Sequence, residues 1–317
     1  MTLPKRRLPG TAYFLSTVCE RHEFRLKPTP QTRAAFAFTL VEAANRHGVD
    51  IIAVMQMSSH YHAVVYDRLG TLSEFMRDFH GVMGRFGSWR DRVENTKFWS
   101  AEESEAVEIG DMETLVDCAA YTLANPTKDF IVERPEQWVG VMTPVDGLGL
   151  GRGEVFQRPK SFFDPEGRTS EGVMLGSDYP HELEELMPIG VFRERVRARV
   201  EEYIAGARAE VDAGRRTFSG VKRAMKRSVW YSARAETGAA AGRGARKARR
   251  RAAAADKGRL QAMLEELLEF RKAHRAAWEA FRRGLRGAVF PAGTWFAWRF
   301  YGVMRLLAVG RTLEAPS

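Results

Sequence analysis

Two histidines separated by a single residue, His60-Tyr61-His62, form the sharpest chemical feature of the sequence. Residues 60–66 are typical of a β-strand, in which alternate side chains share a face, so both imidazoles point one way and Tyr61 points the other. Their Cα atoms then lie about 7 Å apart, a spacing at which two neutral imidazoles can hold one metal ion. Because a His-x-His triplet also arises often by chance, a pair of ordinary structural histidines is the alternative.

Tyr121 and Asn125 form a second pattern, four residues apart. On a helix they share one face, separated by about 6 Å of axial rise, so a candidate nucleophile lies near an amide. Pro126 follows at once and disfavours helix at Asn125. We therefore expect the helix to end or kink close to Tyr121. From these residues alone, a partly buried core tyrosine followed by an Asn-Pro helix stop is the simpler interpretation.

The elements that must position these residues follow from the spacing of the apolar side chains. Strands are indicated over residues 11–18, 51–57, 60–66 and 104–109. Helical spacing covers residues 32–46, 72–93 and 112–124. This order, β-α-β-β-α-β-α, predicts the α+β class, with a ferredoxin-like β-α-β-β-α-β core and one appended helix.

The character of the chain changes after residue 145, which predicts one domain over residues 1–145 and a mostly helical, basic extension over 146–317. Four glycines within 146–153 indicate a linker. Helices are expected near 190–213 and 258–283, the second packing on the core. Like charges repel along residues 238–255, so we expect that basic, low-complexity segment to be mobile.

The charge is unevenly spread over the 317 residues, which carry 49 Lys+Arg and 40 Asp+Glu. Residues 1–150 hold 16 basic and 20 acidic residues, a net charge of −4, which leaves 33 and 20, a net of +13, for residues 151–317. Excess positive charge in one half favours a polyanionic partner such as nucleic acid. The alternative is a solvated basic surface with a tail.

Several classes of protein are disfavoured by composition. Two cysteines, Cys19 and Cys118, cannot form a disulfide framework, and neither has a close partner for a zinc site. The sequence contains no run of about 18 apolar residues, so no membrane span is predicted. The basic stretch Met1–Gly10 has no apolar segment behind it, so we expect no secretory signal and a cytoplasmic location.

Together, the two motifs resemble those of a known family. Residues 57–65, Met-Ser-Ser-His-Tyr-His-Ala-Val-Val, resemble the HUH strand (histidine, hydrophobic residue, histidine) of the single-tyrosine transposases. Residues 120–126, Ala-Tyr-Thr-Leu-Ala-Asn-Pro, resemble their Tyr-x-x-x-Asn-Pro helix. The branch most similar is the REP-associated tyrosine transposases, whose pattern Phe98-Trp99 also fits. The resemblance covers residues 9–143.

This resemblance implies an activity and a role for each motif residue. Tyr121 would attack a DNA phosphodiester, form a 5′-phosphotyrosine link and free a 3′-OH, before the strands are rejoined. His60 and His62 would hold Mg²⁺ or Mn²⁺, and Asn125 would be the third ligand, where related enzymes often have glutamine. Ser58-Ser59 departs from the Pro-Asn that commonly precedes the HUH strand. The implied partner is single-stranded or hairpin-forming DNA, bound by a monomer or a homodimer.

Three alternatives have different sequence signatures. Replication initiators and relaxases share the chemistry but usually carry a longer histidine cluster or paired tyrosines. Zinc hydrolases carry His-Glu-x-x-His or a comparable cluster. A domesticated, catalytically silent hairpin-DNA-binding protein stays open, although the presence of His60, His62 and Tyr121 argues against it. In the extension, residues 243–251 are expected to contact phosphate, and the aromatic, basic segment 290–301 has the composition of a DNA contact.

Overall fold

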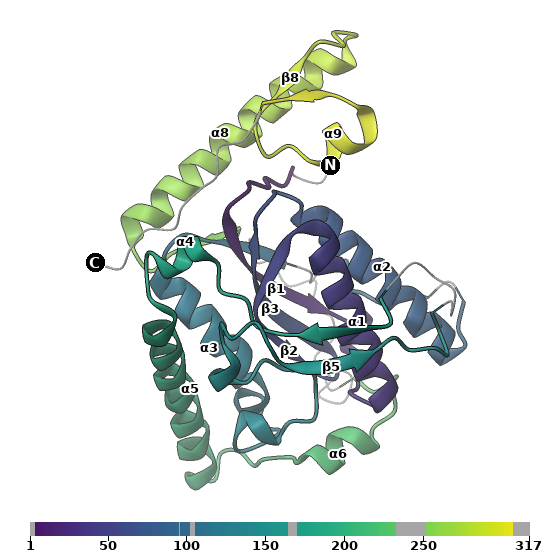
Figure 1. Ribbon diagram of the computed structural model, residues 1–317, viewed down its shortest axis with the longest axis vertical. Helices are drawn as coiled ribbons and strands as arrows, with labels where there is room; N and C mark the ends of the chain where they lie inside the picture. The colour runs from purple at the N-terminus through teal and green to yellow at the C-terminus, as the bar shows by residue number, and fades with distance from the viewer. Residues whose placement is uncertain (1–3, 95, 102–104, 164–169, 233–250, 307–317) are drawn as a thin grey trace.

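The computed structural model describes residues 4–94, 96–101, 105–163, 170–232 and 251–306, and places the chain in the α+β class (Figure 1). The first half consists of β1 (Thr11–Val18), α1 (Pro30–His47), β2 (Val49–Gln56), β3 (His60–Asp67), α2 (Leu72–Asp91), β4 (Glu105–Ile109) and α3 (Met112–Lys128). The second half consists of β5 (Glu154–Gln157), β6 (Gly172–Leu175), α4 (His181–Glu184), α5 (Ile189–Asp212), α6 (Val221–Lys226), β7 (Ala252–Ala253), α8 (Lys257–Arg282), β8 (Val289–Phe290), α9 (Phe296–Tyr301) and β9 (Met304–Arg305).

The central sheet has the strand order β2-β3-β1-β4-β7. Its first four strands pair antiparallel, and only the two-residue β7 runs parallel to its neighbour β4. The four strands predicted from the sequence are therefore present, including the weak fourth one. Strand β3 lies between β1 and β2, so its side chains are supported from both edges.

The two faces of the sheet carry different layers. Helices α1 and α2 cover one face with a core rich in aromatic rings, among them Phe36, Phe79 and Tyr61, and the β5–β6 hairpin packs on α1. Helix α3 covers the other face, and α5 packs on α3 from outside, sharing one apolar core with it. Figure 1 shows α5 (green) beside α3 (teal), at the margin of the sheet. The alternation of β3 thus separates Tyr61 from its two histidine neighbours.

Helix α3 begins where its sequence predicts but ends later. Asp111 caps its N-terminus by accepting a hydrogen bond from the Thr114 backbone N–H. The expected end near residue 124 is wrong, because the helix continues through Pro126 to Lys128. The proline removes only the bond toward the Thr122 carbonyl, and the Asp129 N–H again donates to the Asn125 carbonyl at 2.9 Å. Lys128 thereby lies on the same helix as Tyr121.

The boundary predicted at residue 145 stays a prediction, and the chain on its two sides shares a core. Leu148, within the expected linker, is fully buried, and Phe192, Val196 and Val200 of α5 pack in the same cluster as α3. Ion pairs add to this contact, including Arg195 with Glu113 and Arg199 with Asp117. Helix α5 therefore holds α3 against its own sheet.

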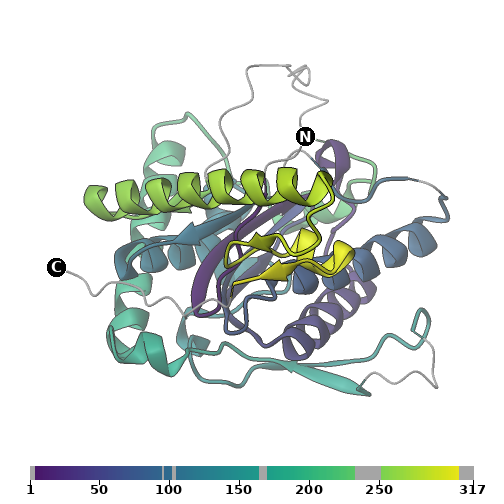
Figure 2. The same ribbon diagram turned by 90° about the horizontal axis from the view of Figure 1, so that it is seen from above.

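The last described segments form a small unit of α8, β8, α9 and β9 near the N-terminus of the chain (Figures 1 and 2). Backbone pairing of Arg6 with Thr294 joins this unit to the first residues. Of the segment expected to be mobile, residues 238–250 lie outside the described residues, as do 243–250 of the expected phosphate contact. Residues 252–253 form β7. Among the described residues, no helix is long and apolar enough to cross a bilayer.

Candidate active site

The two histidines of β3 lie on the α3 side of the sheet. Their rings are neighbours, with centroids 4.9 Å apart. His62 is buried and stacks on Phe14 of β1 at 5.3 Å, while His60 is partly exposed. Tyr61 points into the opposite core, as strand alternation requires. The predicted common face of His60 and His62 is therefore present.

Helix α3 brings Tyr121 and Asn125 to the same place. The Tyr121 ring lies edge-on to the His62 ring, with centroids 5.3 Å apart. The Asn125 side chain is buried, and its Oδ1 lies 3.1 Å from His60 Nε2. Since an amide oxygen only accepts, His60 Nε2 donates here and its Nδ1 accepts from Ser59 Oγ at 3.2 Å. All four residues predicted for the site meet between β3 and α3.

Burial keeps both imidazoles neutral. It lowers the pKa of His62 well below its usual value, with smaller contributions from the charges of His60 and Lys128. It also lowers the pKa of His60, although Asp129 and the hydrogen bond to Asn125 act in the other direction. A neutral imidazole keeps a lone pair for a ligand. His62 Nδ1 is buried and makes no hydrogen bond of full geometry among the described residues, although the Leu15 backbone is close enough to act on the pKa of the ring.

Tyr121 is half-buried and framed by aromatic and basic groups. Burial raises its pKa, and the charges at Asp129 and Tyr203 add to that rise. Lys128, two helical turns further along α3, places its ammonium 3.5 Å from the centre of the Tyr121 ring. Tyr203 of α5 lies edge-on to the Tyr121 ring, with centroids 6.5 Å apart, and the Lys128 ammonium is also 5.3 Å from the centre of the Tyr203 ring. The phenol is thus held in place but remains partly accessible.

Three of these neighbours were not predicted as site residues. Lys128 follows Tyr121 at helical spacing, so it could have been found had the helix been extended past Pro126. Phe14 sits on a predicted strand, but no local pattern reveals that it stacks on His62. Tyr203 reaches the site only because α5 packs on α3, and such long-range packing leaves no local signal in the sequence.

The side chains gathered at the site could supply donor atoms to a metal ion, although none of these donors carries a negative charge. Within the described part of the chain, no group of three or more His, Cys, Asp or Glu side chains is arranged to hold a metal. The set available is two imidazole nitrogens and the amide oxygen of Asn125, all neutral. The Nδ1 of buried His62, which makes no side-chain hydrogen bond among the described residues, and the pairing of His60 with Asn125 support such a set. Its lack of carboxylates predicts modest affinity.

The turn before His60 is fixed by the loop that follows β1. The Leu26 N–H donates to the Ser58 carbonyl at 2.9 Å, and the Cys19 N–H donates to the Ser59 carbonyl at 2.7 Å. Gln56 also donates from its side chain to the Leu26 carbonyl at 3.0 Å. The departure from Pro-Asn at Ser58-Ser59 is therefore compatible with an ordered hairpin that presents His60.

Comparisons with known proteins give a distant structural likeness. No family model matches the chain, and no curated protein matches it. Among solved structures, the chain is similar to a REP-associated tyrosine transposase bound to a REP hairpin, at 14% sequence identity and a TM-score of 0.39. The likeness covers 57% of this chain and 99% of that one. At this score it decides nothing about function, which has to be inferred from this chain's own residues.

Proposed function

We propose that this protein is a metal-dependent enzyme of the single-tyrosine HUH type that cleaves and rejoins single-stranded DNA, with Tyr121 as the nucleophile. One observation carries the proposal. The two patterns that share no local connection in the sequence, the histidine pair and the Tyr-Asn pair, meet with His62 beside Tyr121 and His60 bonded to Asn125. A core tyrosine with a structural histidine pair would not require this meeting.

The arrangement of elements supports the same proposal. The strand order β2-β3-β1-β4, all antiparallel, with α1 and α2 on one face, is the order of a ferredoxin-like split β-α-β fold. Helix α3 is then the appended element that places Tyr121 across from the central strand β3. The nucleophile and the two histidine ligands thus come from different elements, and Asn125 lies on the same helix as Tyr121.

His60, His62 and Asn125 are the residues that would hold the ion. Two imidazole nitrogens suit Mn²⁺ better than Mg²⁺, which prefers oxygen ligands. When bound, the ion would act as a Lewis acid toward the scissile phosphate. For His60 to ligate through Nε2, its proton must move to Nδ1, which then donates to Ser59 Oγ rather than accepting from it.

In the cleavage step, the chain supplies the nucleophile, and the strands are rejoined by the reverse of this step. Tyr121 Oη forms a bond to phosphorus, the bond from phosphorus to the 3′-oxygen breaks, and the phenolic proton ends on that 3′-oxygen. The products are a 5′-phosphotyrosine and a free 3′-OH. A phenol is a weak nucleophile at neutral pH. The Lys128 ammonium beside its ring supplies positive charge where the phosphate must approach.

The partner in this proposal is DNA that can form a hairpin and present an unpaired strand. Since α5 packs α3 onto its own sheet, one chain contains all four residues of the site. A monomer therefore suffices for the chemistry, and a homodimer does not require exchange of α3.

The test mixes purified protein with end-labelled DNA hairpins carrying unpaired flanks and Mn²⁺, followed by denaturing electrophoresis. We expect a covalent protein–DNA adduct that is absent in Tyr121→Phe. Tyr203→Phe is the matched control, because it removes a neighbouring hydroxyl and should retain the adduct. Retained DNA binding without any adduct, over a broad set of hairpins, would instead support the catalytically silent DNA-binding protein.

A further inference from the structure

A basic strap, defined as residues 214–232, is the most one-sided charged segment among the described residues next to the candidate site. It contains six Lys or Arg residues and no Asp or Glu. Its only regular element is the short helix α6. Figure 1 shows this helix running from the end of α5 beneath the body of the molecule. Such a segment has the composition of a contact with a polyanion.

The strap is anchored at both sides of the candidate site. At its start, the Ser219 N–H donates to the Phe130 carbonyl at 2.8 Å, just after α3 ends with Lys128. At its far end, the Phe24 N–H donates to the Tyr231 carbonyl at 3.0 Å. Phe24 belongs to the loop that fixes the turn before His60. The strap therefore connects the element that bears the nucleophile with the loop behind the histidines.

The cations around α6 differ from most of those on the neighbouring helix α5. Arginines of α5 such as Arg199 and Arg208 are paired with Asp117 and Glu133, and Arg215 at the start of the strap is paired with Glu210. By contrast, Lys222, Arg223 and Lys226 are exposed and have no acidic partner within the described residues. Three unpaired charges on one turn and a half of helix repel each other. A chain of phosphates would relieve that repulsion.

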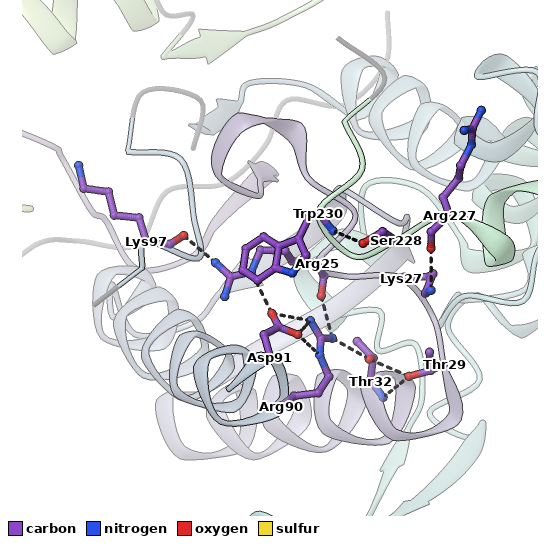
Figure 3. Close-up of polar contacts among 10 residues, drawn as sticks. All are labelled: Arg25, Lys27, Thr29, Thr32, Arg90, Asp91, Lys97, Arg227, Ser228 and Trp230. Atoms are coloured by element: carbon purple, nitrogen blue, oxygen red, sulfur yellow. Dashed lines mark hydrogen bonds and ion pairs between the residues drawn. The ribbon is translucent and has the colours of Figure 1, made fainter. Parts of the chain in front are cut away.

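Trp230 adds an aromatic surface to the strap. Its indole is 42% exposed, which leaves a face open to solvent. Beneath it lies the guanidinium of the fully buried Arg25, 5.0 Å from the ring centre. Arg25 is in turn held by Asp91 at 3.1 Å and by the Lys97 carbonyl at 2.7 Å (Figure 3). A fixed, half-exposed indole is a platform on which an unpaired base can stack.

Lys27 fixes the backbone between the cations and Trp230. Its ammonium donates to the Arg227 carbonyl at 2.8 Å and to the Met225 carbonyl at 3.4 Å. Figure 3 shows Lys27 bonded to the Arg227 carbonyl and, in the same view, Trp230 over Arg25. The strap is thereby held by contacts that do not use its exposed side chains, which stay available for a partner.

A surface hollow lies at the start of the strap. It has a volume of about 410 Å³ and lies between the residues after α3 and the start of the strap. Its lining comprises Asp129, Phe130, Gly214, Arg215, Arg216, Thr217 and Ser219. Asp129 directly follows Lys128, so this hollow lies at the end of α3, and Arg215 and Arg216 of the strap are in its lining.

We propose that the strap binds the unpaired DNA strand that flanks the cleavage site. Lys222, Arg223 and Lys226 contact its phosphates. Trp230 stacks on one of its bases. The inference rests on the proposed function for the identity of the nucleic acid, but binding itself requires neither the metal nor Tyr121. The strap would thus recognise single-stranded character beside a hairpin, rather than a particular sequence.

The first test measures equilibrium binding of fluorescent DNA hairpins in EDTA, with and without mixed-sequence unpaired flanks. The protein is full length and carries Tyr121→Phe, so no cleavage occurs. Replacing Lys222, Arg223 and Lys226 by Gln should weaken binding of the flanked hairpin at least about tenfold, and should reduce the slope of log affinity against log salt by about 2. Replacing the exposed Lys257, Lys272 and Arg275 of α8 by Gln, the same change in charge, should leave both nearly unchanged.

A second test addresses the indole. Trp230→Leu should weaken binding of the flanked hairpin about tenfold, and Trp230→Phe should restore most of it. Binding of the blunt hairpin should change little. Trp89→Leu is the matched control, because Trp89 is 43% exposed on α2 and its ring contacts Phe86 and Phe162. Thermal unfolding of each variant separates loss of the platform from loss of the fold.

The outcomes separate this inference from the proposed function. If the wild type forms the Tyr121 adduct while the strap variants bind flanked DNA like the wild type, the strap inference is wrong and the enzyme stands. If flanked DNA binds through the strap but no adduct forms in Mn²⁺, the strap inference stands and the catalytic proposal fails. Equal losses for the strap and α8 variants would show a general charge effect and would overturn the strap inference.

Discussion

The two faces of strand β3 present the same kinds of side chain in opposite states. On the α1–α2 face, Tyr61 is fully buried, and its hydroxyl contacts His80 Nε2 at 2.7 Å and Thr17 Oγ1 at 3.3 Å. On the α3 face, His62 lies beside the half-exposed Tyr121, and its Nδ1 makes no side-chain hydrogen bond among the described residues. Strand β3 therefore takes part in two tyrosine–histidine contacts. Tyr61 and His80 are hydrogen-bonded to each other, whereas the rings of Tyr121 and His62 meet without such a bond.

The difference shows how a structural cluster can be told from a candidate site when residue types are equal. Buried polar groups are nearly always hydrogen-bonded, because an unsatisfied one costs about 1–3 kcal/mol. The Tyr61–His80 pair follows that rule and needs no ligand. The His62 side follows it less fully, at the place where a nucleophile, an amide and a lysine also gather. The following predictions test whether the two faces really differ in function.

The largest expected effect comes from exchanging one histidine on each face. His62→Gln should reduce adduct formation by about a hundredfold or more, because a lost ligand removes several kcal/mol of charge stabilisation in the transition state. His80→Gln should keep the adduct but lose about 1 kcal/mol of stability, since its contact with Tyr61 is weakened. Rates from denaturing gels and urea unfolding measure the two effects. The opposite pattern would reverse the assignment of the faces.

Cleavage should depend on a metal ion that binds only on the α3 face of the sheet. We expect at least as much cleavage in Mn²⁺ as in Mg²⁺, and none in excess EDTA, because two of the three ligands are nitrogens. Mn²⁺ should raise the melting temperature of the wild type by binding the folded state, and should not raise that of His62→Gln. Cleavage assays and thermal shift with each ion give the readout. Absence of activity in Mn²⁺, or full activity in EDTA, would contradict the ligand assignment.

The loss of folding stability at acidic pH should depend on His80, which contacts Tyr61 on the α1–α2 face. Burial lowers the pKa of His80 to about 3, against about 6.5 for an unfolded histidine. Between these values the unfolded chain binds a proton that the folded chain excludes, so stability falls as the pH drops below about 6.5. His60 and His62 contribute in the same direction. His80→Gln should show a flatter loss of unfolding free energy between pH 7 and 5, and an unchanged slope would exclude His80 as a contributor.

The smallest effect concerns the charge beside the nucleophile. The pKa of Tyr121 is raised by burial first and then by Asp129, so Asp129→Asn should increase the phenolate fraction near neutral pH. A lower pKa of the phenol would accelerate adduct formation a few-fold near neutral pH, and the rates of the two proteins should converge as the pH rises above the phenol's pKa. A pH–rate profile measures this. A slower variant across the whole profile would show that Asp129 helps rather than hinders.

Much of the first half of the fold was predictable from local patterns. Period-two alternation identified β3 and placed His60 and His62 together, and helical spacing identified α1, α2 and the start of α3. The strand β4 was recognised despite Glu105 and Glu108, of which Glu108 is buried and paired with Arg6. These features depend on neighbouring residues in the chain, which is why they could be read from it.

The rest depends on contacts between distant segments. The pairing of β7 with β4, the packing of α5 on α3 and the course of the strap are set by tertiary contacts that local periodicity does not encode. The end of α3 was misplaced because Pro126 is tolerated in its last turn, and Lys128 was missed with it. Tyr203 and Trp230 gained their places beside Tyr121 and Arg25 through these long-range contacts.

The central claim, that Tyr121 and no other tyrosine attacks DNA, is tested most directly by mapping the linked residue. The wild type would be incubated with a flanked DNA hairpin and Mn²⁺, digested with a protease and a nuclease, and analysed by tandem mass spectrometry. We predict a 5′-linked nucleotide on the peptide that contains Tyr121. A nucleotide on Tyr203, on Tyr61 or on any residue other than Tyr121 would contradict the account.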